Sequence, residues 1–454
     1  MFLSRLGLLA AMLTAHASTV SAASSTSTSS GAPTSPTGPL HRIDEIFDIA
    51  HSSHLVYREN VCDRWFTPRP GNRAEGELVT QWGRIWLMNE EAIDRLEQAE
   101  TAVSLMRAFL GNDIRETNNK AVDEAIEEVL HQSYGTYINV QRKMSKPENI
   151  KPAIVCGAPE WLWYVDLDDI AIDENGVLRR GSDGRYITLR QYERSRGNSG
   201  MGDYWWFWAG WTRIGYNSGY VRIPKHQFLP KPDGSAPFPT FRTSNSPIMK
   251  RSGSGVTRVT ESEDLCGGKT GQRSYTVGAQ QIPGRPEWNR QVAITILCPS
   301  SFTQFPTDLR EGPFPPRLPE GAHLSQYGIN ALSLYRKIVR GLYPTWTLRL
   351  VRRAARNRPL RNPNFPARRS AWETSPRHLV NDCLSAMYLS LYDVAAPALE
   401  KAEHHLAFLS PENYMWFALA AYYEAELRCD FSNGVKRPKG SPMQDVDLRN
   451  DIVP

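Results

Sequence analysis

The chain has 454 residues, of which 41% are hydrophobic, and a formal net charge of +5 at pH 7. This length suffices for one large domain or two. The modest charge and the lack of any nucleic-acid-binding fold motif argue against DNA or RNA as a partner.

The N-terminus has the parts of a secretory signal peptide. Arg5 precedes an apolar run from Leu6 to Leu13, and the triplet Val20-Ser21-Ala22 marks a cleavage site. The apolar run is too short to cross a bilayer, and no later stretch reaches roughly 18 consecutive apolar residues. We therefore predict a signal peptide, secretion to the extracellular space and no membrane span.

The segment after the signal peptide is rich in serine and threonine. Ten of the fourteen residues from 24 to 37 are Ser or Thr, two are proline and none is charged. A segment of this composition buries too little apolar surface to fold, so we predict a disordered linker.

Residues 41–150 are helical in pattern. Apolar side chains recur every three or four residues from 93 to 110 and again from 122 to 137, as in amphipathic helices that pack on a core. Residues 90–128 hold eleven acidic and four basic side chains, whereas residues 336–369 hold eleven basic side chains and no acid. These two blocks either neutralise each other in the fold or leave a basic face for an anionic partner.

Beyond residue 151 the pattern changes from helix to strand. Residues 153–156 and 161–165 are short apolar runs, typical of buried strands. The acidic residues that follow, between 166 and 174, are typical of a solvated turn, and their spacing does not match a calcium loop of the EF-hand type. We expect residues 175–290, rich in Gly, Pro and Ser, to form an irregular insertion.

A dense aromatic cluster lies within that insertion. Eight of the seventeen residues from 204 to 220 are aromatic, and four of them are tryptophans: Trp205, Trp206, Trp208 and Trp211. Exposed rings at this density would stack on sugars or peptides, whereas buried rings would form the core of a hairpin. Both interpretations stay open from the sequence.

The six cysteines are Cys62, Cys156, Cys266, Cys298, Cys383 and Cys429. An even number in a secreted chain favours disulfides, and no pair has the C-x-x-C spacing of a zinc or redox motif. We expect three disulfides, whose pairing the spacing does not define.

A strand over residues 292–297, ending in Cys298-Pro299, precedes a helix over residues 329–341. One side of this helix is apolar. Arg336 and Arg340, four residues apart, share the other side, with Lys337 beside them. A zinc peptidase carries the two histidines of HExxH at this spacing, with the glutamate second. The basic face is therefore either a degenerate metal site or an ordinary solvated surface.

The last helical stretch carries a family resemblance. Ser410-Pro411-Glu412, followed by Tyr414, Phe417 and Ala418, is similar to the closing helix of the deuterolysin-type metalloendopeptidases, the aspzincins, which include lysine-specific metallo-endopeptidases. In that family an Asn-Ala-Asp segment precedes a tyrosine and, three residues on, Phe-Ala.

Two further segments resemble the same family in their order along the chain. Residues 292–302 resemble its strand that ends in Cys-Pro followed by Phe, just before the HExxH helix, and Cys383 stands where the family has a cysteine-bearing helix. The resemblance implies a secreted protein on a zincin-like scaffold, and in the family itself a single catalytic zinc.

This sequence departs from the family at the metal site. No HExxH is present, and the positions that resemble it read Arg336-Lys337-Ile338-Val339-Arg340. The third ligand, an aspartate in the family, has no clear counterpart, although Glu373 and Asp382 lie in that part of the chain. Guanidinium has no lone pair for zinc, and a charged lysine cannot accept a proton from water. We therefore predict no catalytic residues, no metal ligands and no cofactor.

We expect a mixed α/β (α+β) fold with N-terminal helices, a twisted sheet, a central active-site-type helix and a helical C-terminal half. The expected organisation is a signal peptide (1–22), a linker (23–40), a helical N-terminal region (41–150), a metallopeptidase-like domain (151–430, with the insertion at 175–290) and a C-terminal tail (431–454).

The functional hypothesis is a catalytically inactive metallopeptidase-like protein that binds a peptide, a protein or an anionic surface. Arg336, Lys337 and Arg340 would contact carboxylate or phosphate groups. One alternative is an active zinc metalloendopeptidase with unrecognised ligands, for example His404 or His405. Another is a polysaccharide- or cell-wall-binding protein that uses the tryptophan cluster.

Overall fold

The computed structural model describes the residues from 38 to 440 in separate ranges: 38–49, 62–66, 76–99, 102–111, 120–148, 151–157, 162–173, 175–198, 201–209, 219–224, 249–252, 255–258, 266, 274–277, 294–303, 314–342, 383, 386, 387, 390, 407 and 410–440. The predicted signal peptide, most of the Ser/Thr-rich linker and residues 441–454 lie outside these ranges.

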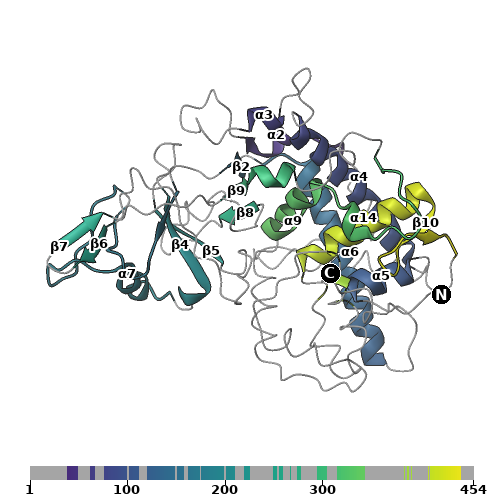
Figure 1. Cartoon of the computed structure of the whole chain (residues 1–454). Coiled ribbons are helices and arrows are strands. Elements are labelled where there is room, and N and C mark those ends of the chain that lie inside the picture. The colour runs from purple at the N-terminus through teal and green to yellow at the C-terminus, as the bar shows by residue number, and fades with distance from the viewer. Residues whose placement is uncertain are drawn as a thin grey trace, which may run out of the picture.

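Most of the described helices gather in one lobe, on the right in Figure 1, and a smaller lobe with strands β4–β7 and helix α7 lies on the left. The described helices are α2 (Ile43–Ile46), α3 (Asp63–Phe66), α4 (Glu77–Glu97), α5 (Val103–Leu110), α6 (Lys120–Ser145), α7 (Leu189–Ser195), α9 (Ala331–Leu342) and α14 (Pro411–Leu427). Short 3₁₀ helices are η2 (Met201–Asp203), η6 (Pro299–Phe302) and η7 (Leu324–Tyr327).

The strands form small sheets. They are β1 (Asp48–Ile49), β2 (Ala153–Cys156), β3 (Leu162–Val165), β4 (Tyr204–Ala209), β5 (Gly219–Pro224), β6 (Met249–Ser252), β7 (Gly255–Arg258), β8 (Ser274–Val277), β9 (Ile294–Leu297), β10 (Cys429–Asp430) and β11 (Arg437–Pro438). The fold is therefore mixed α/β, as expected, and the predicted strands at 153–156, 161–165 and 292–297 are confirmed with shifts of one or two residues at some ends.

A four-stranded sheet in the order β1-β2-β9-β8 packs beside the helical lobe. Strands β1, β2 and β9 run parallel, and β8 is antiparallel to β9. All four residues of β2 are buried, which explains the continuous apolar run that predicted this strand. β1 comes from the N-terminal region, so residues on both sides of position 150 form one sheet.

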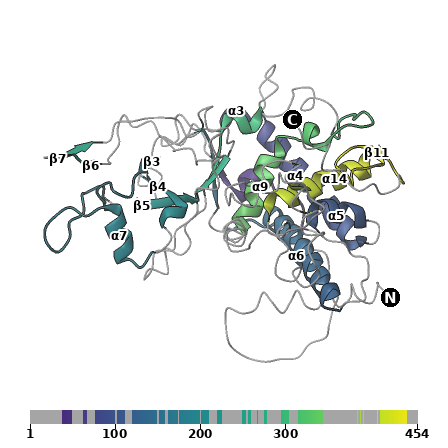
Figure 2. The same cartoon turned by 60° about the horizontal axis from the view of Figure 1, so that its bottom comes forward.

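The helix α9 lies at the centre of the larger lobe, between the sheet and the helices α4 and α14 (Figures 1 and 2). It contacts α4, α14, α6 and the edge strand β8. Every residue from Ala331 to Arg340 is buried. The predicted helix at 329–341 is confirmed, and its position makes it the element that the others surround.

The N-terminal helices belong to the same hydrophobic core as α9 and α14. α4 buries Leu78, Trp82, Ile85 and Met88 in this core, and it contacts α14. Removing the helices before residue 150 would expose this apolar surface to water.

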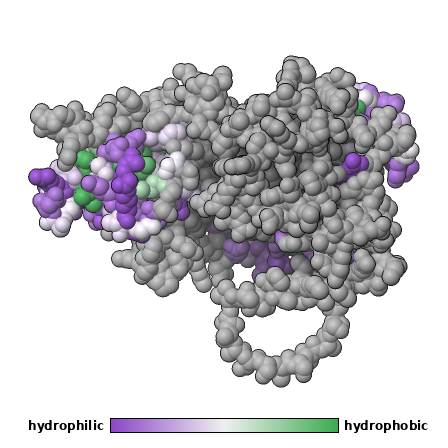
Figure 3. Space-filling view, turned by 90° about the horizontal axis from the view of Figure 1, so that it is seen from below, coloured by the Kyte–Doolittle hydropathy of each residue, from purple (hydrophilic) through white to green (hydrophobic). Residues whose placement is uncertain are grey.

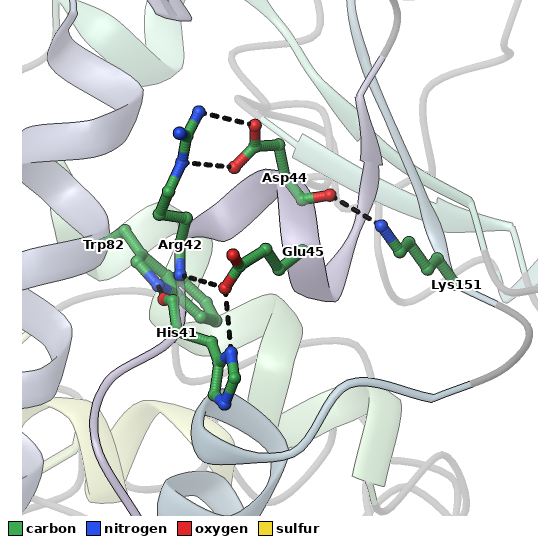
Figure 4. A network of polar contacts seen from close by, with 6 residues as sticks. All are labelled: His41, Arg42, Asp44, Glu45, Trp82 and Lys151. Carbon is green, nitrogen blue, oxygen red and sulfur yellow. Dashed lines mark hydrogen bonds and ion pairs between the residues drawn. The ribbon is translucent and has the colours of Figure 1, made fainter.

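Polar contacts fasten the start of the described chain to this core (Figure 4). Arg42 pairs with Asp44, and the Lys151 ammonium donates to the Asp44 carbonyl at 2.8 Å. The Trp82 indole donates to the His41 carbonyl, also at 2.8 Å. The segment before β1 is thereby held against α4 and against the residues that lead into β2.

The smaller lobe is built on the antiparallel sheet β3-β4-β5. One face of this sheet buries Trp163, Trp206, Trp208 and Tyr220 in a separate hydrophobic cluster, and α7 contributes Leu189 to it. α7 begins with a capping box, in which the Thr188 side chain accepts from the Gln191 amide. Within residues 175–290, the described residues include α7, strands β4–β8 and turns between 175 and 187, and the rest of the predicted insertion lies outside the described ranges.

Residues 428–440, after α14, form a turn and a short hairpin, whereas the rest of the predicted C-terminal tail (441–454) lies outside the described residues. Arg428 adopts a left-handed conformation (φ 50°) at the end of α14, and the chain reverses into the β10–β11 hairpin. Phe431 is fully buried, and its amide donates to the Glu424 carboxylate at 2.7 Å. Burial, with Asp430 nearby, raises the pKa of Glu424 to about 7 despite this hydrogen bond.

The raised pKa of Glu424 predicts a pH-dependent stability. The folded state binds the Glu424 proton more tightly than the unfolded state does. The stabilisation that this proton gives to the fold is therefore fully present below about pH 4.5, and it is lost as the pH rises through about 7. Glu424→Gln keeps an acceptor for the Phe431 amide and removes the charged form. We expect the variant to be more stable than the wild type at pH 8, by about 1–2 kcal/mol, and to match it at pH 4.

Urea unfolding of both proteins between pH 4 and pH 8 measures this difference. Glu426→Gln, an exposed position on the same helix, is the matched control, and its difference from the wild type should stay within about 0.5 kcal/mol. A Glu424→Gln curve parallel to the wild-type curve over the whole range would contradict the prediction.

Candidate functional site

Two buried helices bring the candidate site together. The residues of α14 from Pro411 to Tyr423 are all buried, because this stretch is apolar on every side. Within it, Glu412 is 2% exposed. A buried carboxylate in an apolar helix requires a partner of opposite charge or several donors, and α9 supplies the partners.

Both arginines of α9 contact the same oxygen of Glu412. Arg340 Nη2 lies 2.5 Å from Glu412 Oε1, and Arg336 Nη1 lies 3.6 Å from it. The Ser410 hydroxyl donates to Glu412 Oε2 at 3.4 Å. The i, i+4 spacing that the sequence suggested therefore places Arg336 and Arg340 on one face, and that face meets α14.

Lys337 is buried beside this ion pair, at 2% exposure. Loss of hydration lowers the pKa of Lys337 well below its usual value, and the charges of Arg340 and Arg336 lower it further. The attraction of Glu412 opposes these effects only in part. We call Arg336, Lys337, Arg340 and Glu412 the basic cluster.

The interpretation of this face as an ordinary solvated surface is wrong. Arg336 and Arg340 are only 8% and 5% exposed. The helix periodicity identified the apolar and basic sides correctly, but it could not show that α14 covers the basic side. A second buried element is a tertiary feature, and the apolar stripe of a single helix contains no information about it.

A chain of hydrogen bonds holds the two helices in place around the basic cluster. The Tyr335 hydroxyl donates to Asn89 Oδ1 at 2.8 Å, and Asn89 Nδ2 donates to the Tyr137 carbonyl at 3.0 Å. The Tyr137 hydroxyl then donates to the Tyr414 carbonyl at 2.8 Å. This network joins α9, α4, α6 and α14, and it positions the face of α9 that carries the arginines.

Asn413, the neighbour of Glu412, forms a second set of buried hydrogen bonds. Its Nδ2 group donates to the carbonyls of Phe109 and Ala386 at 2.7 and 2.8 Å, and to the Ser390 hydroxyl at 2.9 Å. Since Asn413 is fully buried, these bonds fix the first turn of α14. Glu412 is thereby held at one depth and one orientation toward α9.

The basic cluster does not fit a zinc ion. Three of its four members are cationic types, and guanidinium has no lone pair to give to a metal. Among the residues that the structure describes, no group of three or more His, Cys, Asp or Glu side chains is placed to hold a metal ion. These four residues therefore do not provide a ligand set for zinc.

Glu412 is the functional-site residue that sequence reasoning missed. The residue was read only as part of a segment that approximates a family motif. The available signal was an acid inside a stretch of apolar residues from 411 to 423, which predicts a buried partner of opposite charge. The sequence contains many arginines, however, so the partner itself was not predictable.

The tryptophans of the aromatic cluster divide between core and outer positions. Trp206 and Trp208 are 1% and 3% exposed and belong to the core of the smaller lobe. Trp205, on the other face of β4, is half-buried and packs edge-on against Tyr164 at 5.9 Å between ring centroids. Trp211 lies outside the described residues. The interpretation of Trp206 and Trp208 as stacking residues for a ligand is therefore wrong.

The remaining candidates give a mixed result. His404, His405, Glu373 and Asp382 lie outside the described residues, so the structure places none of them. In the acidic turn after β3, a carboxylate accepts a hydrogen bond from the backbone of the same turn: Asp169 accepts from the Asp166 amide at 2.8 Å. This is the arrangement of a self-capped turn.

The structure pairs four of the six cysteines. Cys62 is bonded to Cys156 and Cys266 to Cys298, so two of the three expected disulfides are present. Cys383 and Cys429 remain buried thiols. Cys429 donates to the Tyr423 carbonyl at 3.6 Å, and burial raises the pKa of Cys429 to about 11. The expectation of a third disulfide is wrong, because each of these thiols packs within the core instead.

Comparisons with known proteins add no relative. No protein-family model, no curated protein and no solved structure matches the chain. The resemblance to deuterolysin-type peptidases therefore rests on the motifs and their order alone. The described helices also include none that combines the length and apolar character needed to cross a membrane.

Proposed function

We propose that this chain is a secreted, catalytically inactive protein on a metallopeptidase-like scaffold that acts by binding. The observation that carries the proposal is the basic cluster. At the helix positions where the resembling peptidases hold zinc, two arginines and a lysine are buried against Glu412 of the closing helix. An ion pair takes the place of metal–ligand bonds as the link between α9 and α14.

The arrangement of elements supports the scaffold part of this proposal. The strand β9 ends at Leu297, Cys298 follows it, and the buried Phe302 lies in η6, as in the resembling segment before an active-site helix. The central helix α9 comes next, and Tyr414, Phe417 and Ala418 of α14 are all fully buried against it and its neighbours. The burial of these three residues supports the proposed scaffold.

Burial limits how the basic cluster can be used. The side chains of Arg340 and Glu412 are 6% and 3% exposed. A polymer or a flat anionic surface cannot reach them while α14 stays packed. The binding role therefore concerns a small group that enters between the helices, and a carboxylate or phosphate group matches the guanidinium donors best.

Among the described residues, no observation favours the other functional classes. The large hydrophobic residues that are exposed among those described are Leu40, Val79, Leu87 and Val177, and none is aromatic. On the face seen in Figure 3, the described residues of the smaller lobe are mostly hydrophilic. A platform of exposed rings for a polysaccharide is thus missing from the described surface.

Metal analysis and a protease assay test the proposal. The purified secreted protein should contain zinc at well below one ion per chain, and it should leave denatured casein uncut over hours, with an active zinc endopeptidase as positive control. Stoichiometric zinc together with cleavage that a chelator abolishes would reject the proposal and establish the active-enzyme alternative.

A further inference from the structure

One face of α4 is exposed to solvent, and the first half of this face is apolar. Val79 and Leu87 are 46% and 43% exposed, and they are two of the four exposed large hydrophobic residues in the described part of the chain. Gly83 lies midway between them, and the half-buried Trp86 lies beside Leu87. Residues four apart project from the same side of a helix. These side chains therefore form one apolar stripe about two turns long.

Gly83 leaves a notch in the middle of this stripe. A Cβ atom added at this position would meet no atom within 4 Å, so the packing of the fold does not require a glycine here. Glycine inside a helix also costs stability relative to alanine. Val79 and Leu87 stand on either side of the notch, and this shape fits one large apolar side chain from a second helix.

The second half of the same face is acidic. Glu90, Asp94 and Glu97 continue the stripe in steps of three and four residues, and Asp94 and Glu97 are exposed. Partial burial raises the pKa of Glu90, a hydrogen bond from Trp86 opposes this shift, and the charge of Asp94 adds to it. The face therefore changes along its length from apolar to negatively charged.

Neighbouring residues keep this end of α4 acidic. Arg95, the basic residue in this half of the helix, pairs with Glu91 at 3.1 Å. The exposed Glu426 of α14 lies close enough to raise the pKa of Glu91, together with Asp94. A partner that covers the apolar half of the face would therefore gain from positive charge beyond it.

We infer that this face of α4 docks an amphipathic helix of a partner protein, with a large apolar side chain over Gly83 and lysine or arginine residues facing Glu90 and Asp94. We call Val79, Gly83, Trp86, Leu87, Glu90, Asp94 and Glu97 the α4 docking face. It is separate from the basic cluster and adds a partner site to the proposed function. Recognition of an amphipathic helix through apolar anchors and flanking charge is a recurring binding mode.

Charge argues against a second copy of this chain as the occupant. The α4 docking face of another molecule has acids where the occupant needs bases. Pairing two copies over their full length would place carboxylates of one molecule against apolar side chains or carboxylates of the other, and both contacts are unfavourable.

Fluorescence anisotropy with labelled synthetic peptides tests the inference on the full chain. The probe is a helical peptide of about 20 residues with a leucine stripe that ends in lysines. A second probe carries the lysines at the opposite end, because helices pack in parallel or antiparallel orientation, and a third replaces every lysine by glutamate. We expect saturable binding of at least one lysine peptide, with an affinity at least about 10-fold above that of the glutamate peptide. Absence of binding by both lysine peptides, or equal binding of the glutamate peptide, would overturn the inference.

Gly83→Gln is the decisive variant, because it fills the notch while the added side chain points into open space. Its melting temperature should equal or exceed that of the wild type, since glutamine favours a helix more than glycine does. The dissociation constant of the lysine peptide should rise at least about 10-fold, as expected for a bulky group in the centre of an interface. Gly341→Gln is the matched control, since Gly341 of α9 is another helical glycine whose added Cβ atom meets nothing within 4 Å. Wild-type affinity in Gly83→Gln, or an equal loss in both variants, would contradict the proposed location.

A charge exchange separates docking from a general loss of structure. The double change Glu90→Lys and Asp94→Lys should reverse the preference, so that the glutamate peptide binds more tightly than the lysine peptide. Unfolding cannot produce such a gain of binding. An unchanged preference would overturn the inference, and so would a dimer of the wild type in sedimentation equilibrium that Gly83→Gln abolishes, because it would assign the face to a second copy.

Discussion

Replacing Glu412 by alanine is expected to lower the free energy of unfolding by about 3–5 kcal/mol. Removing one partner of a buried ion pair leaves the other charges without compensation, and the cost of that burial dominates. In this chain two guanidinium groups, at 2.5 and 3.6 Å from one carboxylate oxygen, would lose their common partner. Urea unfolding in phosphate-free buffer measures the difference.

Two companion variants sharpen this test. Glu148→Ala breaks an exposed contact with Lys143, where the glutamate side chain is 57% exposed, and it should cost no more than about 1 kcal/mol. The triple change Arg336→Met, Arg340→Met and Glu412→Leu removes the ion pairs together, and it should be far less destabilising than Glu412→Ala. A loss below about 1 kcal/mol for Glu412→Ala would show that the buried contact does not exist in solution.

Removal of the disulfide between Cys62 and Cys156 is expected to have an effect of similar size. The bond closes a sequence separation of 94 residues, and a cross-link of that span restricts the unfolded chain by about 4–5 kcal/mol in the chain-entropy account. The bond between Cys266 and Cys298 spans 32 residues, which corresponds to about 3–4 kcal/mol. The double serine variants of each pair should rank in this order in guanidinium unfolding.

Thiol labelling provides the control for the pairing itself. Alkylation of the denatured, non-reduced protein should modify Cys383 and Cys429, the two buried thiols, and no other cysteine. After reduction, all six cysteines should react. A protein that resists labelling before reduction would contain a third disulfide, and the assignment of these two residues as thiols would be incorrect.

Much of the local structure followed from the sequence because its causes are local. The apolar spacing around Leu332 and Ile338 predicted α9, and the short apolar runs predicted β2, β3 and β9 to within two residues. The same spacing showed that Arg336 and Arg340 share a face. These features depend on side chains that are neighbours along one helix or one strand, and a single sequence contains that information.

Only the tertiary structure decided which element packs against each face of a helix or strand. Glu412 is 72 residues beyond Arg340, and no local periodicity connects them. The burial of Trp206 and Trp208, the pairing of Cys62 with Cys156 and the position of β1 beside β2 also depend on segments that are distant in sequence.

The sequence by itself determined that the positions resembling a zinc site carry cations, which have no lone pair for a metal. The tertiary structure decided that these cations lie in the core, next to the carboxylate of Glu412. The physical reason is that ligand chemistry is a property of residue types, whereas burial and charge balance arise only when distant elements pack together.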